Sequence, residues 1–306
     1  MLKIFLLVLP IFLVLLTGNL LMRLKLMTAD FISVASRLIF NVCLPVLLFY
    51  KISASRFDEV YSPMLILTMG AAVTLMFALS FAAAYILRLP KKSAGTFAMN
   101  NFRANYAYMG LPVCFYAYGE QGLAIASIFM AFIVPYVNML SVLALSLSAA
   151  KAFDRKLFLK NTLLNPIAVS CLIGIGFSVF SIPVPAVIAT TLNIISGITL
   201  PLSLFAIGAT TNMALLRGSM GTVAISTGLK LIGLPLLALL FLKAAGTPVT
   251  LPDKVMIIML SAPCATINYV LASVMEGDTD IASGTIVAST LLSILSFVGW
   301  LHYLSI

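Results

Sequence analysis

The sequence carries very few charges. Only 9% of its 306 residues are Asp, Glu, Lys or Arg and 62% are hydrophobic, whereas soluble domains carry about 25% charged residues. So low a charge content excludes a soluble globular fold. At about 20 apolar residues for each membrane crossing, the chain has room for about ten crossings with short loops. We therefore expect one all-α polytopic membrane domain.

Histidine and clustered cysteine are also nearly missing. The only histidine, His302, lies near the C-terminus, and the four cysteines lie inside apolar stretches without a CxxC spacing. Neither a disulfide framework nor a zinc site is indicated. The sequence also has no HExxH, no GxGD and no aspartate-rich prenyl-diphosphate motif. An intramembrane enzyme is therefore not expected, and no cofactor is predicted.

Apolar runs separated by charged or Gly/Pro-rich segments predict the membrane spans. They give ten helices at 4–22, 31–52, 63–88, 96–118, 121–148, 163–181, 186–213, 221–243, 253–275 and 281–304. The loops after the odd-numbered helices hold ten basic residues, and the opposite side, with the N-terminus, holds five. The positive-inside rule then places both termini outside the cytoplasm, in a plasma or inner membrane. The net charge of +9 follows from this topology and does not indicate a nucleic-acid partner.

The sequence repeats itself at an offset of 156 residues. The matching segments are 9–18 (LPIFLVLLTG) with 165–174 (NPIAVSCLIG), 37–49 (RLIFNVCLPVLLF) with 193–205 (NIISGITLPLSLF), and 125–127 (IAS) with 281–283 (IAS). They predict two five-helix repeats, 1–150 and 151–306. Because five is odd, the second repeat enters the membrane from the opposite face, which is the inverted-repeat architecture of alternating-access transporters.

The fourth and ninth predicted helices, 96–118 and 253–275, each carry a proline amid small and polar residues. Pro112 and Pro263 each remove a backbone donor, and broken backbone at membrane depth persists only where it lines a cavity or packs on protein. If both helices are broken and cross, their half-helix N-termini favour an anion such as a carboxylate. A plain proline kink is the alternative for either helix.

As a set, five motifs resemble the auxin efflux carrier family, within the superfamily that includes bile-acid sodium symporters. They are NYAYMGLP, LNPI, LPLSLFAIGA, SAPCATINYVLA and DIASGTIVASTLLS. The resemblance covers the whole chain. It implies a scaffold of helices one, two, six and seven, a transport domain of helices three to five and eight to ten, and a homodimer through the scaffold. Family substrates are the auxin anion in plants and malonate, malate and similar carboxylates in bacteria.

The resemblance also implies site residues. Asn105, Gly110 and Pro112 correspond to the family's first crossover segment, Pro263 to the second crossover proline, and Tyr136 to a substrate-facing tyrosine of the plant carriers. One departure concerns coupling, because plant carriers have an acidic residue in helix three and the run 63–88 has none. A proton role for such an acid is therefore in doubt.

Charges within the predicted spans are few. All nine acids fall in loops or at helix ends, so sodium held by neutral oxygens near Asn105, Thr266 and Asn268, a proton, and no coupling ion all remain open. Lys230 lies about ten residues into helix eight, roughly 15 Å from its start and near the bilayer centre. It either supports the substrate carboxylate, changes protonation, or contacts carbonyls at a helix break. Arg103, just before the break in helix four, either contributes to the anion path or snorkels to the cytoplasmic surface, and we expect the second.

These observations predict a secondary carrier of a small organic anion with elevator-type alternating access. The candidate substrate-binding residues are Asn105, Gly110, Pro112, Tyr136, Pro263, Thr266, Asn268 and Lys230. An anion channel, a transporter-like sensor, or a sodium symporter of another organic solute are the alternatives. The expected partners are the substrate and the lipid bilayer.

Overall fold

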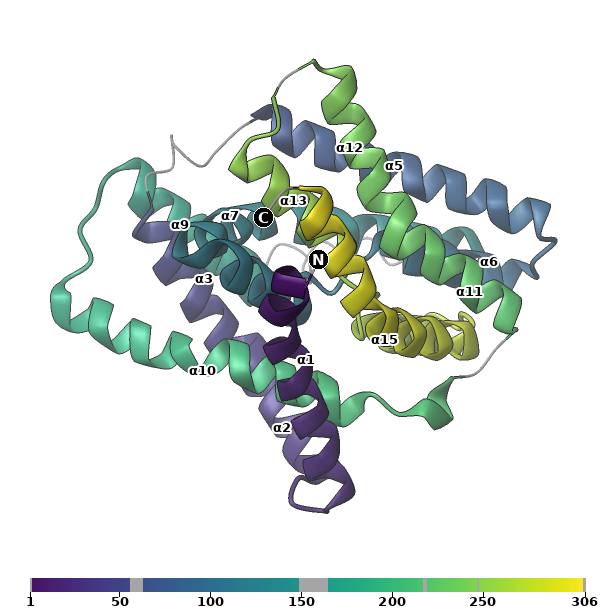
Figure 1. The fold of residues 1–306 in the computed structure, drawn as a ribbon, viewed down its shortest axis with the longest axis horizontal. Helices are drawn as coiled ribbons and strands as arrows, with labels where there is room; N and C mark the ends of the chain where they lie inside the picture. Colours follow the sequence, from purple (N-terminus) through teal and green to yellow (C-terminus); the bar gives the residue numbers. More distant parts are fainter. Residues whose placement is uncertain (1, 56–62, 149–164, 217–218, 247, 305–306) are drawn as a thin grey trace.

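The computed structural model describes residues 2–55, 63–148, 165–216, 219–246 and 248–304 (Figure 1). Within these ranges every regular element is a helix, and the extended backbone is confined to one isolated bridge between Ala104 and Cys264. The α-helices are α1 (Leu2–Arg23), α2 (Ala29–Leu38), α3 (Leu44–Ser53), α5 (Pro63–Ile86), α6 (Lys91–Phe102), α7 (Leu111–Ser148), α9 (Pro166–Val179), α10 (Ala186–Thr210), α11 (Met220–Gly228), α12 (Leu234–Ala244), α13 (Leu251–Ser261), α14 (Ile267–Val274) and α15 (Thr279–Tyr303). The 3₁₀ turn η3 (Met213–Leu215) follows α10.

Seven helical stretches of the described residues are long and apolar enough to cross a membrane. They are Leu2–Arg23, Ala29–Ser53, Pro63–Ile86, Tyr106–Ser148, Ala186–Thr210, Met220–Ala244 and Thr279–Tyr303. The ten predicted spans differ from these because the run 253–275 divides into two short helices, the run 163–181 yields a 14-residue helix, and the runs 96–118 and 121–148 join. The protein is thus all-helical and polytopic, and the number ten remains a prediction.

The joined stretch is bent at a glycine. As a straight rod, the 38 residues of α7 would extend about 57 Å, far beyond a hydrocarbon core of about 30 Å. Gly119 has φ +64° and ψ −155°, which is outside the helical region. A left-handed φ of this kind costs glycine little, because glycine has no Cβ. The chain therefore turns at Gly119 between two helical segments.

Three five-residue π-helical turns share one sequence signal. These turns are η1 (Ile39–Cys43), η2 (Tyr106–Gly110) and η4 (Leu229–Gly233), and each is followed directly by Leu-Pro. In each case the amide of that leucine bonds to the carbonyl five residues earlier. A proline ring clashes with the carbonyl four residues before it and donates no hydrogen bond. The wider turn relieves the clash, so the Leu-Pro step explains where the helices widen.

Helices α1, α2, α3, α9 and α10 gather on one side of the molecule (Figure 1). Within this group α1 packs on α10, and α3 packs on both α9 and α10. The α1–α10 crossing is very close: a Cβ on Gly208 would lie 1.9 Å from the Leu15 carbonyl oxygen, and one on Gly18 would lie 2.4 Å from that of Phe205. Only glycine allows the two backbones to approach in this way.

The α3–α9 contact resembles the α1–α10 contact at positions shifted by 156. A Cβ added at Gly174 would lie 3.3 Å from the Cα atom of Phe49. Gly18 faces the backbone of Phe205 in the same way. The hydroxyl of Thr199 donates to the carbonyl of Cys43 at 3.1 Å, and these two residues are themselves 156 apart. The three contacts therefore occur at the positions that the sequence repeat makes equivalent.

Helices α5, α6, α11, α12 and α15 form the other side of the molecule (Figure 1). Here α5 packs on α6 and α12, and α15 packs on α6, α11 and α13.

An ion pair of 2.7 Å joins Lys51 at the end of α3 to Glu120, just after the turn in α7. Asp253 in the first turn of α13 and Asp278 just before α15 accept backbone amides at the starts of these helices.

Candidate functional site

Two helices are interrupted where they meet. α6 ends at Phe102 and α13 ends at Ser261, and Ala104 pairs with Cys264 as an antiparallel bridge. The Asn105 amide donates to the Pro263 carbonyl at 2.7 Å, and the Ala265 amide donates to the Arg103 carbonyl at 3.1 Å. We call residues 103–105 and 262–265 together the crossover.

A new helix starts on the far side of each break. The Asn105 side chain accepts the Tyr108 amide at 3.2 Å as η2 begins, and Thr266 precedes α14 without a side-chain cap. Four amides, those of residues 106, 107, 266 and 267, have no acceptor among the described residues. Helix starts of this kind carry partial positive charge and free N–H donors, which suit an anion.

Pro112 does not form the break, contrary to the prediction. It lies in the first turn of α7, and the interruption is at Arg103–Asn105, seven or more residues earlier. The proline instead follows the π turn η2. The break itself is held by hydrogen bonds to the other crossover segment. Pro263, in contrast, lies within the crossover and supplies the carbonyl that Asn105 binds.

Asn268 joins the crossover to the neighbouring helices. It is fully buried, and its amide nitrogen donates to the Asn100 side-chain oxygen at 3.1 Å and to the Cys264 sulfur at 3.1 Å. Asn100, also fully buried on α6, donates in turn to the Ile281 carbonyl of α15 at 3.3 Å. The Cys264 amide donates to the Ser289 hydroxyl at 3.0 Å. One polar network thus connects α6, the crossover, α14 and α15.

Two oxygens beside this network have no partner among the described residues. They are the side-chain oxygens of Asn268 and Thr285, both fully buried. Thr285 lies one helical turn from Ile281 and one from Ser289, the two α15 residues that contact the network. Buried oxygens without donors suit a water, a cation or a substrate donor. Neutral oxygens of this kind are also suitable ligands for sodium, which the sequence leaves open as a coupling ion.

Lys230 reaches a carbonyl at the second break. It lies in the π turn η4, it is fully buried, and its Nζ donates to the Leu260 carbonyl at 2.7 Å. Leu260 belongs to the last turn of α13, whose carbonyls have lost their helical partners. Of the three roles considered for Lys230, this contact corresponds to the one at helix-break carbonyls. It does not exclude the other two, because an ammonium has three donors.

Arg103 does not snorkel to the surface, contrary to the prediction. Its side chain is 9% exposed, and Nη1 donates to the Ser141 hydroxyl on α7 at 3.0 Å. The residue is extended, with φ −91° and ψ 102°, because it lies in the break itself. The Arg103 side chain therefore starts at the crossover, inside the protein, and not on a helix face near the membrane surface.

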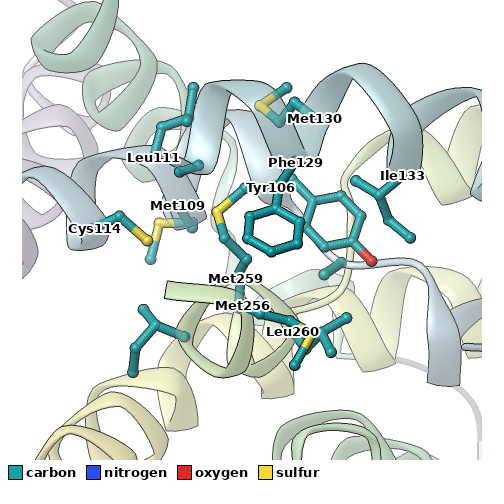
Figure 2. Close-up of a cluster of buried hydrophobic side chains, with 14 of the residues drawn as sticks. Tyr106, Met109, Leu111, Cys114, Phe129, Met130, Ile133, Met256, Met259 and Leu260 are labelled. Atoms are coloured by element: carbon teal, nitrogen blue, oxygen red, sulfur yellow. The ribbon is translucent and has the colours of Figure 1, made fainter. Parts of the chain in front are cut away.

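An apolar cluster supports the crossover from one side (Figure 2). Tyr106 and Met109 of η2 pack in the same core as Met256 and Met259 of α13. A Cβ at Gly110 would lie 2.8 Å from the Met259 sulfur, so a larger residue would have to displace the Met259 side chain. Gly110 thus serves packing beneath the crossover.

The hydrogen bond of Tyr136 joins α7 to α5 and does not involve the crossover. Tyr136 belongs to α7, it is half-buried, and its hydroxyl bonds to that of Thr74 on α5. Six of the predicted site residues lie in the crossover or contact its immediate neighbours: Asn105, Gly110, Pro263, Thr266, Asn268 and Lys230. The other two do not, because Pro112 follows η2 and Tyr136 bonds to α5.

Four residues that sequence reasoning did not select contribute to the site: Asn100, Ser141, Thr285 and Ser289. Asn100 and its neighbour Asn101 form a pair of amides in an otherwise apolar run, which was the available signal. The serines and the threonine gave no signal, because hydroxyl residues in membrane helices commonly bond to their own backbone.

Comparisons with known proteins identify the family. The family described as "Membrane transport protein" matches residues 3–152 and 144–301. An "Uncharacterized transporter" of Methanothermobacter thermautotrophicus is 26% identical over 300 residues, which cover 96% of each chain. A "Putative malonate transporter" of Rhizobium meliloti is 24% identical over 303 residues, which cover 97% of this chain and 94% of its own. The chain is an integral membrane transporter and belongs to this membrane transport protein family, the auxin efflux carrier family that its motifs resemble.

Proposed function

We propose that the protein is a secondary carrier of a small organic carboxylate, which binds at the crossover. The observation that carries this proposal is the bridge between Ala104 and Cys264, with the free amides at positions 106, 107, 266 and 267. No carboxylate of the described residues forms an ion pair at this place. The name of the Rhizobium relative, with its mention of malonate, agrees with a substrate of this class.

In this proposal Asn105, Thr266 and Asn268 bind the substrate or a coupling ion. Asn105 uses its side-chain oxygen for the Tyr108 amide, so its amide nitrogen is the group available for a carboxylate. Thr266 is half-buried and its hydroxyl caps no helix. Asn268 offers the unpartnered oxygen, which suits a cation better than an anion. Lys230, Pro263 and Gly110 shape the crossover, Pro112 widens the turn at which the second half-helix begins, and Tyr136 forms part of the pocket wall.

We assign the mechanism to an elevator movement between two inverted repeats, 1–150 and 151–306, with ten crossings. Two close contacts that a shift of 156 residues makes equivalent support the repeat: Gly18 with Phe205, and Gly174 with Phe49. The scaffold comprises α1, α2, α3, α9 and α10. The remaining helices form the transport domain, whose shift along the scaffold would expose the crossover to either side. A dimer through the scaffold, and termini outside the cytoplasm, belong to the same proposal.

The test is electrical recording from proteoliposomes that contain the purified protein. Malonate, malate, succinate, lactate and indole-3-acetate are applied, each with and without sodium and at two pH values. We expect saturable currents for at least one carboxylate, and their sodium or pH dependence then identifies the coupling ion. No current and no tracer flux for any of the five, from folded protein, would refute the proposal and favour another substrate class or a sensor. Conductance far above carrier turnover would indicate a channel.

Asn105→Ala links the activity to the crossover. We expect lost transport with normal membrane insertion, because the variant removes both the cap on Tyr108 and the free amide. The matched control is Asn212→Ala, which removes an asparagine cap of the same kind from the Ala214 amide at the start of η3, and which should transport normally. Wild-type uptake by Asn105→Ala would remove this residue from the site.

A further inference from the structure

Two buried cations at the crossover have no negative partner among the described residues. Arg103 is 9% exposed and Lys230 is fully buried. Each reaches only a neutral oxygen, the Ser141 hydroxyl or the Leu260 carbonyl, and neither forms an ion pair with a described carboxylate. A buried charge is costly unless a counter-charge or a full set of hydrogen bonds compensates it.

Helix ends offset part of this charge. Arg103 directly follows the C-terminus of α6, and Lys230 contacts a carbonyl in the last turn of α13. Each helix C-terminus contributes about half a negative charge. With both groups protonated, two positive charges against two half charges leave the crossover positive. With Lys230 neutral, Arg103 and the helix starts at η2 and α14 still keep it positive.

Both cations are connected to the segments that carry the free amides. The Arg103 carbonyl accepts the amide of Ala265, the residue before Thr266. Leu260, which Lys230 contacts, precedes Cys264 of the crossover by four residues. A substrate at the amides would therefore lie within the field of both charges.

We propose that Arg103 and Lys230 together set the charge selectivity of the crossover and favour a dianionic carboxylate over a monoanionic one. The substrate supplies the counter-charge that the described part of the protein lacks. Arg103 acts here through its field as a specificity-determining residue, since its one assigned hydrogen bond is to Ser141. This inference rests on the proposed function, because it concerns the same anion at the same place.

A field effect has a signature that a structural effect lacks. Coulomb energy is proportional to the charge of the ligand. Removal of one positive charge from the protein therefore lowers the affinity for a monoanion by some factor and the affinity for a dianion by the square of that factor. The affinity for a neutral ligand hardly changes. At an effective dielectric constant of about 20 and a separation of about 10 Å, the factor for one unit charge is about tenfold. A purely structural change would weaken all three ligands alike.

The experiment is titration calorimetry on the purified full chain in detergent with three ligands of nearly equal size. Malonate carries two negative charges, malonamate one, and malonamide none. We expect wild type to bind malonate more tightly than malonamate, and Arg103→Gln to weaken malonate about 100-fold and malonamate about tenfold. Lys230→Met should show the same graded loss. Arg103→Lys and Lys230→Arg keep the charge and should preserve the ratio of the two affinities.

Ser141→Ala is the matched control for structure. It removes the assigned partner of Arg103 and leaves the charge, so malonate and malonamate should change by the same factor. Equal weakening of both ligands in Arg103→Gln, with wild-type binding intact, would overturn this inference and leave the proposed function standing. If Arg103→Gln does not fold, Lys230→Met decides by the same criterion. Wild-type protein that binds none of the five carboxylates of the transport panel would overturn the proposed function and this inference with it.

Discussion

Gly208→Ala is expected to destabilise the protein strongly, because α1 and α10 cross there backbone to backbone. An ideal Cβ at Gly208 would lie 1.9 Å from the Leu15 carbonyl oxygen, whereas ordinary contact begins at 3.4 Å, so the helices would have to separate by about 1.5 Å (3.4 − 1.9). The obstacle is main chain and cannot rotate away. Overpacking of a tight interior costs about 1–3 kcal/mol, and we expect the upper end of this range.

Other glycines provide a graded series. At Gly18 the same calculation gives about 1.0 Å (3.4 − 2.4), again against a carbonyl oxygen, and at Gly174 the nearest atom is the Ile52 Cβ at 3.1 Å. Gly176 and Gly197, on α9 and α10, have open space around the added Cβ. Alanine there gains helix propensity of up to about 1 kcal/mol, so these two variants are the controls.

The assay is thermal unfolding of the detergent-purified variants, with the amount inserted in membranes as a second readout. The expected order of midpoint temperatures is Gly208→Ala lowest, then Gly18→Ala, then Gly174→Ala, with both controls at or above wild type. If Gly208→Ala unfolded at the same temperature as the Gly176→Ala control, α1 and α10 could not cross at the distance described.

Three further predictions concern the network, an ion pair and the topology. Ser289→Ala leaves the buried Cys264 amide without its acceptor at 3.0 Å and should lower the free energy of unfolding by about 1–3 kcal/mol; stability equal to that of the exposed control Ser273→Ala would contradict this. Lys51→Met removes the partner of Glu120, which is 69% exposed, so chemical denaturation should show a loss below about 1 kcal/mol, and a larger loss would contradict the surface character of the pair. Alkaline phosphatase fused after Ile306 should be active and a fluorescent protein there dark, and the reverse pattern would place the C-terminus in the cytoplasm.

Apolar runs located the long helices well, because a membrane span requires an unbroken apolar segment. The runs 186–213, 221–243 and 281–304 agree within three residues with the stretches Ala186–Thr210, Met220–Ala244 and Thr279–Tyr303. Hydropathy cannot fix the residue at which such a run is interrupted, because a window of about 19 residues averages a short polar segment such as Arg103–Asn105 with its apolar neighbours. For this reason the divisions at 103–105 and 262–265 required the structure.

The position of the first break shows why a proline alone did not predict where the helix is interrupted. Pro112 widens the turn before it, η2, whereas the interruption at Arg103–Asn105 depends on pairing with residues about 160 positions later in the chain. No local pattern reports a partner at that separation. The same reason hid Asn100 and Ser289, whose roles come from contacts with Asn268 and Cys264.

The Leu-Pro steps nevertheless carry information that reaches the site. The π turn before Pro112 contains Tyr106 and Gly110 and begins after Asn105, and the π turn before Pro235 contains Lys230. An inserted residue in a helix turns the side chains on one side of it by about 100° relative to those on the other. Widened turns therefore set the directions in which the half-helix start at η2 and the Lys230 side chain face the crossover. Pro112, which was predicted to open its helix, therefore acts by widening the turn before it and orienting the residues of that turn, whereas a straight helix would point the same residues in other directions.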